Sequence, residues 1–220
     1  MQIFENIWQV GDDGFSSPGD AAIYLVANKG KAALIDSGTG HGHKQVKANI
    51  SKCLPAEVSI ESLFLTHCHF DHTGGAEKLR KEYGLKIIAH KLDAGFLEKG
   101  DDEVTVASWY NASLSGLEID HKIETDTEIF KIGDSELKAI HWPGHSPGSI
   151  ILVIEKDGKK IVFGQDVHGQ LHPSLLSNRE DYLISLNMLI GLDADILCEG
   201  HYGVIEGKEK VKKFIEQFVK

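Results

Sequence analysis

Four side chains that could bind a metal fall within six positions of the sequence: His67, His69, Asp71 and His72. Imidazoles and a carboxylate this close together, without binding partners, would be costly to bury in a folded protein. A divalent cation removes that difficulty, because neutral imidazole and carboxylate are the usual ligands of zinc and its neighbours. The alternative is a polar loop that is rich in histidine by chance, since 12 of the 220 residues are histidines.

Four further polar segments follow short apolar runs in the same way. They are 141–148 after 137–140, Asp166 after 161–163, His201 after 196–198 and Asp36 after 33–35. Glycines in these segments let the backbone turn sharply, and the strands before them would hold the side chains in place. One such loop is weak evidence, but several in one chain predict a metal centre.

The elements that must position these loops are strands in two groups, each followed by helices. Strands are expected at 3–10, 21–27, 31–35, 63–65 and 85–89, and again at 128–132, 136–140, 149–154, 160–163 and 196–198. Helices are expected at 43–53, 75–83, 91–99, 180–192 and 206–219. The pattern predicts an α/β (α+β) fold in one domain over 1–220, with two facing sheets, helices outside and the site at one edge.

With these loops in order, the chain resembles the metallo-β-lactamase superfamily of metallo-hydrolases. The resemblance rests on 66–72, on 143–148, on Asp166 and on Gly200-His201, and it extends from Asp36 to His201. It implies the αββα four-layer sandwich of that family, with two mixed β-sheets face to face.

The resemblance also implies a dinuclear metal site. His67, His69 and His145 would bind one ion, and Asp71, His72 and His201 the other, with Asp166 bridging both. Two divalent ions are expected, zinc in the first place and iron or manganese as alternatives. Asp36 would orient a ligand imidazole.

The implied reaction is hydrolysis of a small-molecule ester, thioester or lactone, with phosphoesters next. A hydroxide that bridges the metals would attack, because metal binding can lower the pKa of water to about 7. Asp71 would be the catalytic residue that passes a proton to the leaving group. The alternative within the superfamily is a mononuclear non-haem iron dioxygenase similar to the persulfide dioxygenases.

Three features distinguish this chain from particular members of the superfamily. Two-zinc β-lactamases commonly have Cys where this chain has Asp166, and acyl-homoserine lactonases place a Tyr just after that Asp. The glyoxalase II ligand set matches, but the C-terminal extension that binds glutathione in that family is not expected here. Specificity is expected to come from 100–117, a helical or irregular insertion, and from 167–178.

Five other histidines are not expected to bind metal. His90 and His121 are expected to be ordinary residues, His41 and His43 helix-start or surface residues, and His141 a packing residue or a support for a ligand. His168 and His172 are the best candidates for substrate contacts. Cys68 is expected to be a small packing residue rather than a nucleophile.

Composition excludes several classes of function. The formal net charge is −10 and no block of Lys or Arg offers a track for phosphates, so nucleic acid is not an expected partner. No apolar run is long enough for a membrane span. The three cysteines are odd in number and widely spaced, which favours a reducing compartment. We expect a cytoplasmic enzyme with a small-molecule substrate. Both a monomer and a homodimer are compatible with the sequence.

Overall fold

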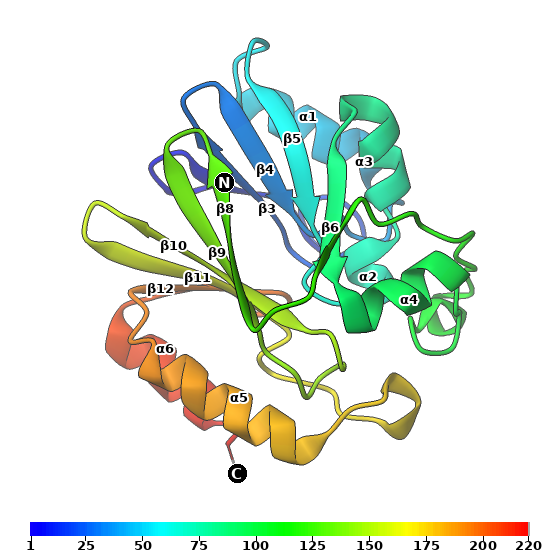
Figure 1. Cartoon of the computed structure of the whole chain (residues 1–220). Coiled ribbons are helices and arrows are strands. Elements are labelled where there is room, and N and C mark those ends of the chain that lie inside the picture. The colour runs from blue at the N-terminus through cyan, green and yellow to red at the C-terminus, as the bar shows by residue number, and fades with distance from the viewer. Residues whose placement is uncertain (220) are drawn as a thin grey trace.

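The computed structural model describes residues 1–219 and contains two mixed β-sheets packed face to face (Figure 1). The first sheet has the order β1-β2-β3-β4-β5-β6-β7. Its strands are β1 (Gln2–Phe4), β2 (Ile7–Gly11), β3 (Ile23–Asn28), β4 (Lys31–Ile35), β5 (Ser59–Phe64), β6 (Lys86–His90) and β7 (His121–Ile123). Strands β4 to β7 are parallel, so the carboxyl ends of β4, β5 and β6 meet at one edge.

The second sheet has the order β13-β12-β11-β10-β9-β8. Its strands are β8 (Thr127–Ile132), β9 (Ser135–His141), β10 (Ile150–Lys156), β11 (Lys159–Gln165), β12 (Ile196–Glu199) and β13 (Gly203–Glu206). Both β9 and β11 run antiparallel to β10, and β12 is parallel to β11. The carboxyl ends of β9, β11 and β12 therefore also share one edge.

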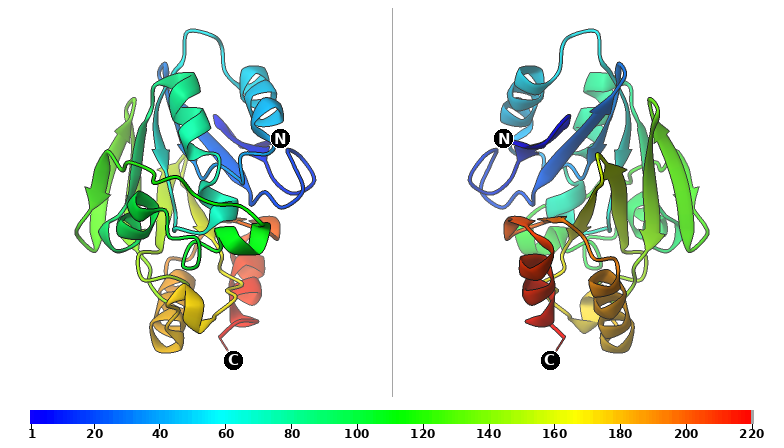
Figure 2. Two further views of the ribbon diagram at one scale, coloured as in Figure 1. Left: turned by 90° about the vertical axis from the view of Figure 1, so that its right-hand side faces the viewer. Right: turned by 90° about the vertical axis from the view of Figure 1, so that its left-hand side faces the viewer.

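Helices cover the outer faces of both sheets and complete the predicted αββα sandwich (Figures 1 and 2). The helices α1 (His43–Cys53), α2 (Phe70–Thr73), α3 (Ala76–Tyr83) and α4 (Lys91–Lys99) belong to the first half of the chain. The helices α5 (Arg179–Gly191) and α6 (Lys208–Glu216) pack at the opposite end of the molecule. Two 3-10 turns, Ala107–Tyr110 and Pro173–Leu175, lie in the long connections.

Strand β10 shows why both faces of a sheet are buried. Leu152 and Ile154 point into the core between the sheets, whereas Ile151 and Val153 point into the core beneath α5 and α6. Alternate residues of a strand face opposite sides, so an unbroken apolar run fits a strand that is covered on both faces. A third apolar core lies between the first sheet and the helices α1, α3 and α4. The three cores thus correspond to the three interfaces between the four layers.

Most predicted elements lie within a residue or two of their observed bounds, but the predicted helix at 206–219 begins too early. Its first residue, Glu206, ends strand β13, which pairs with β12 through Cys198 and Val204. Gly207 has a φ of 99°, a left-handed conformation that separates the strand from α6. The strand β13 was missed because its four residues are too few to show a period. Among residues 1–219 no helix is both long and apolar enough to cross a membrane.

Candidate metal centre

The seven predicted metal ligands meet where the strand ends of the two sheets converge. Four come from the loop after β5 and the short helix α2, and three come from the loops that follow β9, β11 and β12. The first group is His67, His69, Asp71 and His72, and the second is His145, Asp166 and His201. Each sheet therefore contributes part of a single site.

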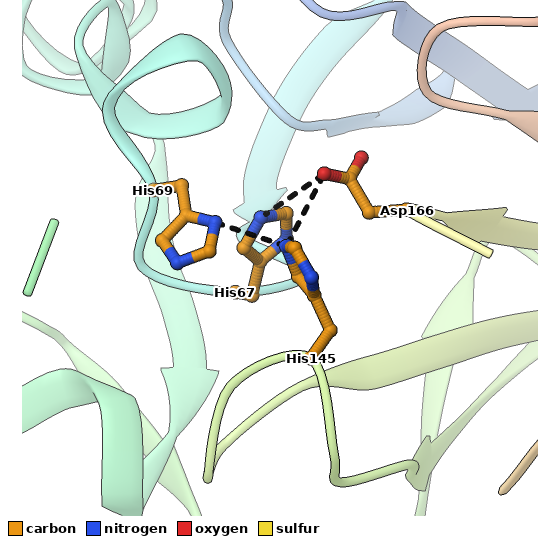
Figure 3. A group of neighbouring side chains, drawn as sticks. All are labelled: His67, His69, His145 and Asp166. Atoms are coloured by element: carbon orange, nitrogen blue, oxygen red, sulfur yellow. Dashed lines mark hydrogen bonds and ion pairs between the residues drawn. The ribbon is translucent and has the colours of Figure 1, made fainter. Parts of the chain in front are cut away.

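Three histidines and one carboxylate form the first half of the site (Figure 3). Nδ1 of His69 lies 3.0 Å from Nε2 of His145. Oδ2 of Asp166 lies 3.2 Å from Nε2 of His145 and 3.9 Å from Nε2 of His67. All four side chains are buried, and one ligand atom from each lies within 4.8 Å of the others.

The second half of the site lies on the other oxygen of Asp166. Nε2 of His72 is 3.1 Å from Oδ1 of Asp166, and Nε2 of His201 is 3.4 Å from the same oxygen. Oδ2 of Asp71 lies 3.3 Å from Nε2 of His201. The two oxygens of Asp166 thus face different groups of ligands, which is the geometry expected of a bridging carboxylate.

The hydrogen bonding of these side chains fits cation binding. Nε2 of His67, of His69 and of His72 are all buried and make no hydrogen bond within the described structure. Buried polar groups without partners are costly. Nδ1–H of His72 donates a hydrogen bond to Asp36, so in the neutral form of His72 the Nε2 lone pair faces the carboxylate of Asp166. Two acceptors at 3.1 Å need a cation or a proton between them.

Protonation differs between the two halves. Burial, followed by repulsion from His145, lowers the pKa of His69 to about 3, so its imidazole is neutral and ready to bind a metal. Burial lowers the pKa of His201 as well, but hydrogen bonds to Asp166 and Asp71 outweigh that effect and raise it to about 10. The three carboxylates Asp166, Asp71 and Asp36 likewise hold the pKa of His72 well above its usual value, against its burial. A metal in the second half must displace protons.

Asp36 has the orienting position that the sequence predicted for it. Its Oδ2 lies 2.6 Å from Nδ1 of His72, and its two oxygens accept hydrogen bonds from the amide and the hydroxyl of Thr66, each at 2.8 Å. The residue is fully buried and has a φ of 59°, an uncommon conformation for a residue other than glycine. One carboxylate therefore orders both the start of the ligand loop and one of its ligands.

A second buried carboxylate, Asp93 of α4, was not predicted. It accepts hydrogen bonds from the amide of Cys68 at 2.9 Å, the hydroxyl of Ser146 at 2.6 Å and the amide of Gly148 at 2.6 Å. Asp93 thereby joins the loop that carries His69 to the loop that carries His145. A Cβ at position 148 would lie 2.6 Å from Oδ1 of Asp93, so glycine is required there.

A cavity of about 400 Å³ opens over the metal centre. Its floor contains His69, Asp71, His145, Asp166 and His201, and its walls include Val106, Trp109, Tyr110, Leu175 and Tyr202. Burial, followed by the nearby charge of Asp71, raises the pKa of the Tyr110 hydroxyl. The wall residues from 106 to 110 and Leu175 come from the two segments predicted to decide specificity.

Of the remaining histidines, one lines the cavity and the others make packing, surface or capping contacts. His90 and His141 stack on each other with ring centroids 4.0 Å apart, and His121 pairs with Glu128 at the surface. His41 lies edge-on to Phe70, and His43 is near Glu82 at the start of α1. His172 caps a 3-10 turn. Only His168 lines the cavity, where it also forms a possible metal-binding group with Asp166 and His201.

Comparison with known proteins places this geometry in a family context. Residues 17–201 match the family model of the metallo-beta-lactamase superfamily. The chain is 28% identical over 206 residues to the probable metallo-hydrolase YqgX of Bacillus subtilis, a match that covers 83% of this chain and 90% of that protein. It is 27% identical to the human acyl-coenzyme A thioesterase MBLAC2, covering 98% of this chain and 84% of the relative. It spans 50% of the thioesterase pkgB of Emericella nidulans, at 26% identity.

Solved structures share the fold at lower identity. The subclass B3 metallo-β-lactamase BJP-1 of Bradyrhizobium japonicum superposes with a TM-score of 0.78 at 22% identity, covering 99% of this chain and 89% of that one. The superfamily protein ST1585 of Sulfolobus tokodaii gives a TM-score of 0.73 at 19% identity, covering 98% and 86%. Both likenesses extend over nearly the whole chain.

Proposed function

The chain belongs to the metallo-β-lactamase superfamily, and on that premise we propose that it is a metal-dependent hydrolase of a small thioester, or of a related ester or lactone. The observation that carries the proposal is the set of seven ligand side chains gathered at and beneath the floor of a cavity, with several buried ring nitrogens that make no hydrogen bond within the described structure. Two divalent ions, zinc in the first place, would be held by His67, His69 and His145 and by Asp71, His72 and His201, with Asp166 between them.

The cavity walls support an uncharged acyl group as the part of the substrate that enters. Val106, Trp109, Leu175 and Tyr202 offer apolar surface, and burial of apolar groups stabilises a complex. None of the described residues that line the cavity is Lys or Arg. An anionic carrier such as coenzyme A would therefore keep its phosphates outside, and only the acyl thioester would reach the metals.

The names of three relatives favour thioesters among the possible substrates. The MBLAC2 proteins carry the name acyl-coenzyme A thioesterase, and two fungal relatives are named thioesterase pkgB and atrochrysone carboxyl ACP thioesterase. The names give two acyl carriers, coenzyme A and ACP. They therefore support a thioester as the bond that is cleaved, but not one particular carrier. They give the dioxygenase alternative no support.

The protein's own residues would handle the proton. Metal ions bound here would supply a water of lowered pKa and would polarise the substrate carbonyl. Oδ2 of Asp71 lies at the floor of the cavity, 3.3 Å from Nε2 of His201, and Tyr110 lines the same cavity. In this proposal Asp71 takes up a proton and returns it to the leaving thiolate.

A substrate panel with defined metal content tests the proposal. Purified protein is stripped with a chelator, reloaded with zinc, and assayed with acyl thioesters of cysteamine and coenzyme A, with aryl esters, with lactones and with an aryl phosphodiester. We expect thioester turnover that disappears in the stripped protein and returns with zinc. Two equivalents of metal should accompany full activity.

Two results would contradict the proposal. One is a fully zinc-loaded protein that hydrolyses only the phosphodiester, or none of the panel. The other is a protein that is purified with a single iron and consumes oxygen with a persulfide substrate, which would establish the dioxygenase instead.

A further inference from the structure

We propose that His168 is an additional metal ligand, which Glu199 holds toward the ion bound by Asp71, His72 and His201. This inference rests on the two-metal centre proposed above and extends its ligand set by one residue. The family pattern described for the seven ligands does not include this position.

The placement of His168 is the first argument. It lies two residues beyond Asp166, lines the cavity, and has a ligand atom within 4.8 Å of those of Asp166 and His201. The rings of His168 and His201 have centroids 5.1 Å apart and are nearly perpendicular, at 78°. Their ring edges can therefore approach one point without stacking on each other.

The loop that carries His168 is fixed on both sides. Before it, the carbonyl of Val167 accepts a hydrogen bond of 2.6 Å from the hydroxyl of Tyr182. After it, Gly169 has a φ of 44°, and a Cβ there would lie 2.7 Å from the ring of Tyr182. The backbone of this loop therefore turns tightly against α5, which sets where the imidazole can lie.

Glu199 gives the second argument, because it orders His168 and His201 together. Its Oε1 accepts hydrogen bonds from the backbone amide of His168 at 3.1 Å and from Nδ1 of the same residue at 2.8 Å. Its Oε2 accepts from the amides of His201 at 2.7 Å and Tyr202 at 2.9 Å. The carboxylate is fully buried.

This hydrogen bonding decides which ring nitrogen of His168 is available. A carboxylate that accepts four hydrogen bonds acts only as an acceptor, so Nδ1 of His168 carries a hydrogen and Nε2 presents a lone pair. Metal-bound histidines almost always donate their other N–H to a carboxylate or carbonyl in this way. Asp36 and His72 show the same arrangement of a carboxylate behind an imidazole.

The consequence for coordination is specific. With Asp71, His72, His201 and the bridging Asp166, the second ion has four protein ligands, and His168 would make five. Counting the hydroxide that the two ions would share, the ion near His168 would have no position left for substrate, which would bind the ion held by His67, His69 and His145.

Metal titration of three single variants tests this inference without reference to activity. Stripped protein is titrated with zinc, and separately with cobalt, against a competing chelator. We expect the wild type to bind two equivalents, and His168→Ala to bind the second about 10–100-fold more weakly with the first unchanged. The visible absorption of the second cobalt should change as well, because the coordination number falls. His172→Ala, a matched change four residues away, should behave like wild type.

His168→Asn separates metal binding from ordering of the loop. The amide nitrogen of Asn can take the place of Nδ1 and keep the hydrogen bond to Glu199, but nothing replaces Nε2. We expect His168→Asn to bind the second equivalent as weakly as His168→Ala does. Wild-type affinity in the Asn variant would overturn the inference and leave the two-metal centre standing, whereas a wild type that binds one equivalent would overturn both.

Discussion

Nδ1 of His72 lies 2.6 Å from Oδ2 of Asp36, and both groups are completely buried. Because Asp36 also accepts two hydrogen bonds from Thr66, its carboxylate is held in place before any metal binds. Nε2 of His72 is therefore aimed at Asp166 by a group that never touches the substrate. Burial raises the pKa of Asp36, while His72 and Thr66 oppose that change.

Asp36→Asn should weaken metal binding about 10–100-fold, since partners behind a ligand typically contribute that much. The amide cannot accept every hydrogen bond that the carboxylate accepts, so the orientation of His72 is lost. Competition with a chelator measures the affinity, and circular dichroism checks the fold. Asp126→Asn, on the surface, is the control. Unchanged affinity in Asp36→Asn would show that the pair is only a packing contact.

His69→Ala should remove one equivalent of metal and abolish hydrolysis together. The side chain supplies one of three imidazoles to the first half of the site, and its neutral form needs no proton displaced. Metal analysis and turnover are measured on the same preparation. His121→Ala, an exposed histidine paired with Glu128, should change neither. Full metal content with full activity in His69→Ala would mean that the ligand assignment is wrong.

Metal affinity should rise with pH between about 6 and 8. In the metal-free protein the pKa of His201 is about 10 and that of His72 is raised, so both carry protons that a metal must displace. Each displaced proton makes affinity increase roughly tenfold per pH unit. His67 and His69 have lowered pKa values and add nothing in this range. Calorimetry in two buffers of different ionisation enthalpy counts the protons released, and none released would contradict the protonation argued here.

Trp109→Ala should reduce kcat/KM for long-chain acyl thioesters about tenfold and leave acetyl thioesters nearly unaffected. The indole forms part of the cavity wall, and apolar contacts of this kind are worth roughly 1–3 kcal/mol. Its side chain is 53% exposed. Ile129→Ala, 54% exposed on the far part of the second sheet, is the matched control. Equal losses for short and long chains would remove Trp109 from the substrate wall.

His90→Asn should make the metal-free protein less sensitive to acid. Burial, followed by the charge of His141, lowers the pKa of His90 from 6.5 to about 4. Between these values the unfolded chain binds a proton that the folded protein does not, so the free energy of unfolding decreases as pH falls from 6.5 to 4. Asn keeps an acceptor for the amide of Leu92 and has no titration there. Thermal unfolding at several pH values should show a smaller loss of Tm in the variant, by roughly a few degrees; parallel curves would exclude this contribution.

The meeting of the seven proposed ligands could be expected because each follows a short apolar strand, a local pattern that is visible in a sequence, and the family resemblance supplied their division between two ions. The residues that order them could not. Asp93 lies inside the helix α4, where nothing in the spacing distinguishes it from a solvated helix residue, and only the fold brings it to Cys68 and Gly148. Glu199 follows an apolar run, but its complete burial depends on contacts with loops from distant parts of the chain.

The sequence predicted which segments form the cavity wall, but not which of their side chains face the cavity. Residues 100–117 contain one 3-10 turn and otherwise irregular chain, and no periodic pattern gives the positions of such side chains. The position of Tyr110 on the cavity wall, close to Asp71, therefore became apparent only from the structure. His168 was predicted as a substrate contact and does line the cavity, but the sequence did not indicate that it lies beside Asp166 and His201.

The ligands of each proposed ion come from both sheets. The geometry of the metal centre therefore depends on the position of one sheet relative to the other. Tyr24 of β3 reaches across the interface, packing on Phe163 and donating a hydrogen bond of 2.7 Å to the carbonyl of Glu199. A small slide of one sheet over the other would pull His67 away from His145 before it broke any backbone pairing. Substitutions deep in the interface, far from any ligand, should therefore change how tightly the protein retains its metals.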